Sequence, residues 1–134
     1  MPKTLFRLLS IFLLAMTTSA ATFAQSPPVV LGTWTGEVAQ NNGSTGYSVV
    51  MTISANAAET DYPELKCSGK LTRVGAANGY VFFTETITRG GKSSGGDCID
   101  GTITVAPAAD KLNWGWIGGY KNETLVAWGT LARK

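Results

Sequence analysis

The stretch "LGTWTGEVAQ", Leu31 to Gln40, carries an alternating pattern that decides the fold. Trp34, Gly36 and Val38 fall on one face of an extended chain, and three polar residues fall on the other. A period of two is typical of a strand that buries one face. The stretch therefore predicts a first strand that presents Trp34 to a core.

The same alternation recurs further along the chain and predicts an all-β domain. Further strands are expected at residues 47–54, 65–74, 80–88, 98–105, 111–117 and 124–133. Segments rich in Gly, Asn and Ser separate them and mark turns, namely "NNGSTG" (41–46), "RGGKSSGG" (89–96) and Gly118-Gly119. We expect "ANAAETDYP" (55–63) to be a long connection without a strand of its own.

Seven to eight short strands of this kind predict an antiparallel meander that closes into a small barrel. An open sheet would expose two edges to other chains, and closure removes them. Gly69, Gly101, Gly115 and Gly129 lie inside the expected strands and suit the sharp bends of a small barrel. A two-sheet β-sandwich is the alternative that the pattern leaves open.

The first 24 residues are typical of a secretory signal peptide. Lys3 and Arg7 precede the apolar run "LLSIFLLAM", and the small residues of "TTSAATFA" follow, with cleavage expected after Ala24 or Ala21. The apolar run is shorter than the roughly 20 residues that a membrane-spanning helix needs. We therefore expect a secreted or periplasmic protein without a membrane span, with an extended linker at 25–30 and one domain at 31–134.

Two cysteines, Cys67 and Cys98, are expected to form a disulfide in that oxidising compartment. Strands on either side of a third lie about 9.6 Å apart, whereas bridged Cα atoms lie about 5.5 Å apart. A bond through the sheet is thereby excluded. The disulfide should instead pass beneath the end of the intervening strand and hold the loop 89–96.

Composition excludes several classes of function. Without Lys3 and Arg7, nine basic residues balance nine acidic ones, so the concentrated basic face that nucleic acid requires is not expected. The chain has no histidine, which removes His-based catalysis and His-ligated metals. Asp97 and Asp100 flank Cys98 and could hold a calcium ion together with Asp61. Their spacing is not that of an EF-hand loop, so solvated turn carboxylates are the preferred interpretation. We expect neither a metal nor a cofactor.

Gly32-Thr33-Trp34 at the head of the first strand, with Arg133 at the end of the last, resembles the calycin pattern of lipocalins and avidins. The resemblance implies a structural plug, in which Trp34 closes the base of the barrel and Arg133 packs over it. The segments "YPELKCSGKL", "FTETI" and "CIDGTIT" also look like a small secreted bacterial domain of unestablished role, and bring no catalytic residues with them.

Glu85 is the acidic residue with the most unusual position. It shares the parity of Val81 and Phe83, so it could point into the apolar interior, where desolvation would raise its pKa. The preferred alternative is that the threonine-rich face of this strand points inward, or that Glu85 pairs with Arg73 or Arg133.

Tryptophans offer the best lead to a binding surface. Trp114 and Trp116 share one face of a strand with Leu112, where they could stack on a sugar or a partner's side chain, although core packing is the preferred interpretation. Trp128 has the opposite parity to its apolar neighbours and is expected to be exposed. An eight-stranded barrel is just wide enough to be filled by side chains, and bulky inward candidates are available on nearly every expected strand: Trp34, Tyr47, Met51, Leu71, Phe83, Ile103, Trp114 and Leu131.

These observations favour a monomeric, non-catalytic binding module with a packed barrel, not an enzyme. It would recognise a protein or a glycan through its rim loops, 41–46 and 89–96, together with Trp128. A carrier of a small apolar ligand is one alternative. A small hydrolase is another, and it would need two inward carboxylates roughly 5 to 9.5 Å apart.

Overall fold

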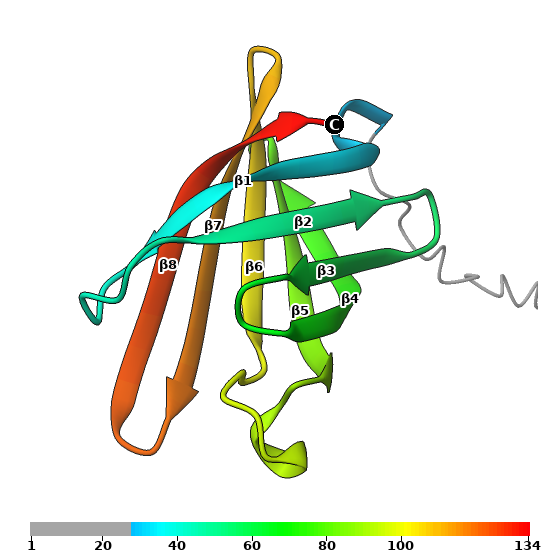
Figure 1. Cartoon of the computed structure of the whole chain (residues 1–134). Helices are drawn as coiled ribbons and strands as arrows, with labels where there is room; N and C mark the ends of the chain where they lie inside the picture. Colours follow the sequence, from blue (N-terminus) through cyan, green and yellow to red (C-terminus); the bar gives the residue numbers. More distant parts are fainter. Residues whose placement is uncertain (1–27) are drawn as a thin grey trace, which may run out of the picture.

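The computed structural model describes residues 28–134, in which eight strands form one closed barrel (Figure 1). Each strand pairs antiparallel with the next along the chain, and β1 also pairs with β8. This confirms the closed meander and excludes the sandwich. The signal peptide expected at 1–24 lies outside the described residues. The strands are β1 (Gly32–Gln40), β2 (Tyr47–Ile53), β3 (Ala58–Tyr62), β4 (Cys67–Ala77), β5 (Tyr80–Arg89), β6 (Gly101–Ala108), β7 (Lys111–Tyr120) and β8 (Glu123–Arg133).

The register of β1 defines two different ends of the barrel. Trp34 pairs with Arg133 at the end of β8, so the start of β1 and the C-terminus lie together at what we call the closed end (top of Figure 1). Gln40 pairs with Ala127 near the start of β8, at the opposite, open end. The loops 41–46, 63–66 and 90–100 also lie at the open end.

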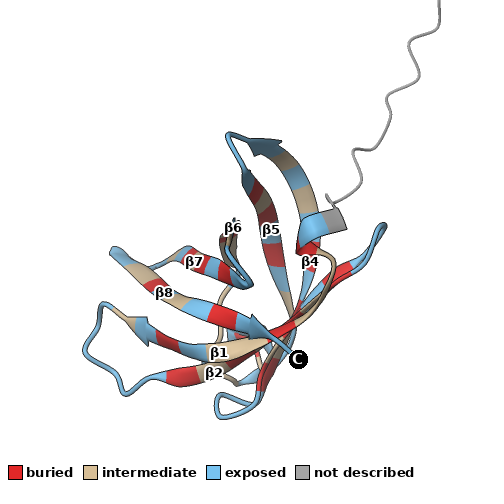
Figure 2. Cartoon of the chain, turned by 90° about the horizontal axis from the view of Figure 1, so that it is seen from above, coloured by how far each residue is buried: buried red, intermediate tan, exposed pale blue. Residues whose placement is uncertain are grey.

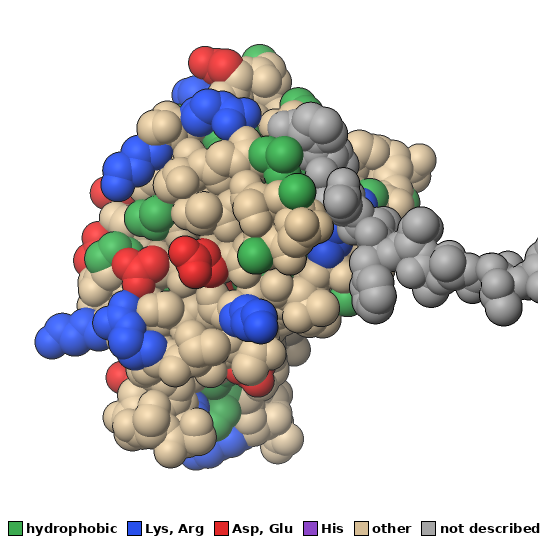
Figure 3. Space-filling model, turned by 90° about the vertical axis from the view of Figure 1, so that its right-hand side faces the viewer, with side chains coloured by type: hydrophobic (Ala, Val, Ile, Leu, Met, Phe, Trp, Pro, Cys, Tyr) green, Lys and Arg blue, Asp and Glu red, His purple; other side chains and the backbone are tan. Residues whose placement is uncertain are grey.

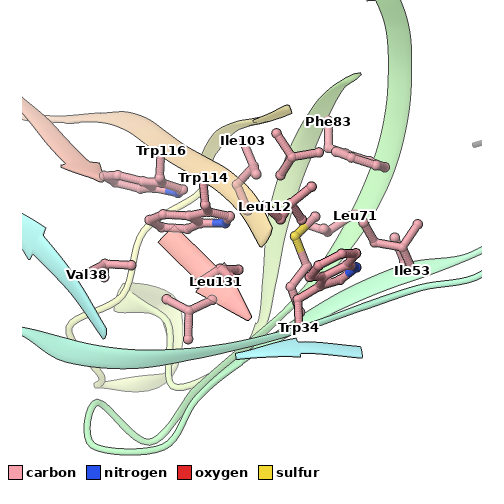
Figure 4. Packing of buried hydrophobic residues seen from close by; sticks show 14 of the residues in the cluster. Trp34, Val38, Ile53, Leu71, Phe83, Ile103, Leu112, Trp114, Trp116 and Leu131 are labelled. Atoms are coloured by element: carbon pink, nitrogen blue, oxygen red, sulfur yellow. The ribbon is translucent and has the colours of Figure 1, made fainter. Parts of the chain in front are cut away.

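Alternation along the strands places the core inside the barrel, as expected. On β2 every second residue, from Tyr47 to Ile53, is buried, and the residues between them are partly exposed (Figure 2). Every strand contributes apolar side chains to this core, part of which is drawn in Figure 4. The eight bulky residues expected to point inward are all buried, namely Trp34, Tyr47, Met51, Leu71, Phe83, Ile103, Trp114 and Leu131.

Trp34 and Arg133 together seal the closed end. The Trp34 side chain is buried, and its Nε1 donates a hydrogen bond to the carbonyl of Val30 at 2.9 Å. The Arg133 guanidinium lies 4.2 Å from the centre of the Trp34 ring and donates to the carbonyl of Leu31 at 2.6 Å. Residues 28–30, expected to be part of an extended linker, instead form a short 3₁₀ helix, η1 (Pro28–Val30), because Val30 packs into the core.

Three expectations about the strands are wrong. The segment 55–63 contains a strand, β3, that buries Ala58, Thr60 and Tyr62, and only the last of these is large and apolar, so its alternation is weak in the sequence. Leu65, expected to begin the next strand, lies instead in the turn before β4 and is exposed.

The third wrong expectation concerns Gly118-Gly119, which do not form a turn. The strand β7 continues through them to Tyr120, and the chain reverses at residues 121–122. A Cβ atom at Gly118 would lie 2.4 Å from Cη2 of Trp116. A glycine is therefore needed there because the Trp116 indole lies against the backbone, and not because the chain turns.

Cys67 and Cys98 form the expected disulfide, with Cα atoms 6.4 Å apart. Cys67 begins β4 and Cys98 lies just before β6, so the bond passes the end of the intervening strand β5. The loop that follows β5 contains the short 3₁₀ helix η2 (Lys92–Ser94), and Gly91 pairs with Cys98. The disulfide thus holds this loop against the open end.

Charges of both signs are interspersed on the face shown in Figure 3. Arg89 on β5 and Asp61 on β3 form an ion pair at 2.8 Å. Within residues 28–134, the structure has no helix of the length and apolar character needed to cross a bilayer.

Candidate functional site

A pocket of about 560 Å³ opens at the end of the barrel opposite Trp34. Its volume lies in the range typical of small-molecule sites, about 300–1,000 Å³. The rim loop 41–46 and the disulfide-held loop both contribute to its edge. The apolar and aromatic part of the lining consists of Tyr47, Tyr62, Leu65, Ile87, Ile99, Trp116 and Leu125.

Glu85 is a buried carboxyl group in the lining of this pocket. Its side chain points into the barrel because β5 buries Val81, Phe83 and Glu85 and exposes Thr84 and Thr86. The preferred expectation, that the threonine face points inward or that an arginine pairs with this carboxyl, is therefore wrong. Only 2% of Glu85 is exposed, and among the described residues it is, with Thr60, one of two buried polar side chains.

Three neutral donors hold the Glu85 carboxyl. The Tyr62 hydroxyl donates to Oε1 at 2.7 Å, and Nε1 of Trp116 donates to Oε2 at 2.8 Å. The Thr60 hydroxyl makes a third, short hydrogen bond to Oε1 and also lies 3.5 Å from the carbonyl of Gly69. Thr60 can thus donate to an ionised Glu85, or accept from a protonated Glu85 while donating to Gly69.

Burial controls the protonation of the groups around Glu85. Desolvation raises the pKa of the Glu85 carboxyl above its usual range, although the hydrogen bonds from Thr60, Tyr62 and Trp116 oppose this shift. Burial and the nearby Glu85 raise the pKa of Tyr47 to about 12, and they raise the pKa of Tyr62 well above its usual value. Both tyrosines therefore act as neutral hydroxyl groups over the physiological range.

Two glycines allow side chains from non-adjacent strands to reach Glu85. Gly69 on β4 lies between Thr60 on β3 and Glu85 on β5, and a Cβ there would meet Glu85 Oε1 at 2.6 Å and Thr60 Oγ1 at 2.9 Å. Gly101 on β6 pairs with Glu85 on one side, and a Cβ there would meet the Trp116 indole at 2.4 Å. Strands two apart are separated by about 9.6 Å, so any side chain on the middle strand would block these contacts.

Tyr47 and Tyr62 form an aromatic wall beside the carboxyl. Their ring centres are 6.1 Å apart and their planes meet at 72°, an edge-to-face arrangement that is favourable for aromatic pairs. The Tyr47 hydroxyl donates to Oε1 of Gln40 at 3.1 Å, which links the wall to the end of β1. These contacts fix the orientation of both rings without a ligand.

The tryptophans expected to form a binding surface lie in three different environments. Trp116 lines the pocket and donates to Glu85. Trp114 is buried in the core, where its Nε1 has no hydrogen-bond partner, so the structure does not place it on an accessible surface. Trp128 is 51% exposed on the outer face of β8, where it pairs with Gly115 and Ala39. The structural pair at the closed end, Trp34 and Arg133, does not line this pocket.

The aspartates considered as calcium ligands have separate partners. Asp61 pairs with Arg89, Asp97 with Lys92 at 3.2 Å, and Asp100 accepts from the backbone of β5. Residues 28–134 contain no group of three Cys, Asp or Glu side chains placed to hold a metal ion together.

Sequence reasoning considered Glu85 but missed Thr60 and Tyr62. Both lie on β3, which is weak in the sequence, and their contact with Glu85 depends on the register of three strands. The sequence pattern that could have predicted the site is an acidic residue on the inward face of one strand, with a glycine on the inward face of each neighbouring strand. Comparison with known proteins gave no match, whether to a family model, a curated protein or a solved structure.

Proposed function

We propose that this chain is a non-catalytic binding module that takes a small ligand in the pocket at the open end of its barrel. The observation that carries the proposal is a pocket with aromatic walls and one buried carboxyl whose hydrogen-bond partners are already in place. A few fixed polar groups among apolar walls are typical of binding sites for small molecules.

The arrangement also supports a calycin-like organisation. In this proposal Trp34 and Arg133 close one end of the barrel, and the ligand enters at the other end, between the rim loops. The disulfide adds support for a secreted or periplasmic location, since such bonds persist in oxidising compartments.

A binding role is favoured over hydrolysis because the described residues give the pocket only one buried carboxyl. The other acidic residues in its lining, Glu64 and Asp97, are exposed at the rim. The oxygens of Glu64 accept hydrogen bonds from the backbone and side chain of Ser48, which lowers the pKa of Glu64, so it serves to hold the turn before β4. A carboxylate-based hydrolase would need two acidic groups facing one another across the substrate.

The four tryptophans make a direct test possible, because each indole N–H gives a separate NMR signal. We expect titration with 2-phenylethanol, a small aromatic alcohol, to shift the Trp116 signal and leave the Trp128 signal in place. Trp→Phe variants at both positions assign the signals. A probe that shifts only Trp128 would overturn the pocket proposal and would favour recognition of a protein or a glycan on the outer face of β8, where that ring is exposed.

A further inference from the structure

The ionisable side chains of opposite sign are unequally represented in the pocket lining, which is acidic. Among the described residues that line it are three carboxyl groups, those of Glu64, Glu85 and Asp97, and no Lys or Arg. Lys92 lies close by, but it pairs with Asp97 at the outer edge. A ligand that enters therefore meets negative charge at the rim and again at the buried carboxyl.

The Glu85 carboxylate has hydrogen-bond donors but no counter-charge among them. Thr60, Tyr62 and Trp116 are all neutral, so they satisfy lone pairs without compensating the charge. Burying an ionised carboxylate without a partner is costly, and an opposite charge offsets that cost. The ionised group can accept about four hydrogen bonds. Among the donors in residues 28–134, Oε2 receives only the one from Trp116. One acceptor position is thus available for a ligand.

The walls suit a cation as well. Tyr47, Tyr62 and Trp116 present three aromatic rings around the carboxyl, and the faces of such rings attract ammonium and guanidinium groups. Leu65, Ile87 and Leu125 provide apolar surface for the rest of a ligand. An anionic ligand would instead meet the like charge of Glu85 at short range in a site of low dielectric constant, where repulsion is strong.

We propose that the pocket selects a small organic cation, an amine or guanidinium joined to an apolar body, with the Glu85 carboxylate as its counter-charge. This inference rests on the proposed binding function of the same pocket and names the class of ligand. The cationic group would donate to Oε2 of Glu85 beside Trp116, and the apolar body would lie toward the mouth of the barrel.

The test compares three probes of one shape, 2-phenylethylamine, 2-phenylethanol and phenylacetate, by calorimetry and by the Trp116 indole signal at neutral pH. The amine and the alcohol can both donate a hydrogen bond to the carboxylate, but only the amine brings an opposite charge, so we expect it to bind the full folded protein at least about tenfold more tightly than the alcohol. Phenylacetate should bind most weakly.

The variant Glu85→Gln should abolish the preference for the amine, so that the amine and the alcohol bind with similar affinity. A glutamine amide can still accept from Trp116 and donate to the oxygens of Thr60 and Tyr62. Glu37→Gln, on the exposed outer face of β1, is the matched control and should keep the preference for the amine. The indole signals of Trp34 and Trp114 report whether each variant is folded.

The outcomes separate this inference from the binding function on which it rests. Equal affinity for all three probes, with a shifted Trp116 signal, would refute cation selectivity and leave the binding pocket in place. A preference for the amine that persists in Glu85→Gln would also refute the inference. If no probe binds, both proposals are overturned. The comparison of probes on the wild-type protein decides the question even if Glu85→Gln does not fold.

Discussion

Replacing Glu85 with Gln should change how the stability of the protein depends on pH. The folded state raises the pKa of this carboxyl above its ordinary value of 4.5, because burial disfavours the charged form. Between 4.5 and the raised value, the folded state binds more protons than the unfolded state. The free energy of unfolding of the wild type therefore falls as the pH rises through this window.

The size of the effect follows from the same linkage. Within the window, Glu85 contributes a slope of at most about 1.4 kcal/mol per pH unit, and the total loss is about 1.4 kcal/mol for each unit of pKa shift. Desolvation promotes this shift, and the three hydrogen bonds to the carboxyl reduce it. Glu85→Gln has no titrating group at this position, so its stability relative to the wild type should rise with pH and then level off.

Urea unfolding of both proteins from pH 4 to pH 8, followed by circular dichroism, measures this difference. Most other titrating groups are common to the two proteins and cancel. The control Glu37→Gln removes an exposed carboxyl from β1 and separates the effect of burial from the loss of one charge. If the free energy of unfolding of Glu85→Gln, relative to that of the wild type, fell as the pH rose, folding would favour the charged form of Glu85. That result would refute the reasoning.

Three further predictions concern the frame around the pocket. Trp34→Ala should lower the free energy of unfolding, measured with urea, by about 3 to 5 kcal/mol. A double-mutant cycle with Arg133→Ala should give an interaction energy between the two side chains of about 0.5 to 1 kcal/mol. An interaction energy of zero would contradict the packing at the closed end. When protein from its native compartment is alkylated without reductant, its intact mass should show no free thiol, and two alkylated thiols would contradict the disulfide. Replacing both cysteines should lower the free energy of unfolding by roughly 3 to 4 kcal/mol and leave the strand content unchanged. Gly118→Ala should displace the indole of Trp116 and lower the free energy of unfolding by about 1 to 3 kcal/mol. An unchanged Trp116 indole signal in NMR would contradict the close contact between this ring and the backbone at Gly118.

Much of the fold could be predicted because alternation along a strand is a local property. The buried positions of β2 were readable in this way, and so was the exposure of Trp128. The inward face of β5 was not, because a threonine-rich face and an acidic residue left its orientation open. The strand β3 was not, since its inward residues include Ala58 and Thr60, which carry little hydrophobic signal. The pair Gly118-Gly119 resembled a turn because a sequence does not show which ring lies against a backbone.

The sequence by itself determined the all-β class, the inward faces of most strands and the cysteine pair, because each depends on local periodicity or on residue type. Only the tertiary structure determines which residues come together around Glu85 to form the candidate site. Thr60 and Trp116 meet Glu85 across sequence separations of 25 and 31 residues, and each does so over a glycine on the strand between. Those contacts exist only when the register of β3 to β7 is fixed, since a shift of one residue turns a side chain to the opposite face. Closure of the barrel is what turns one inward acidic residue into a buried carboxyl at the inner end of an aromatic pocket.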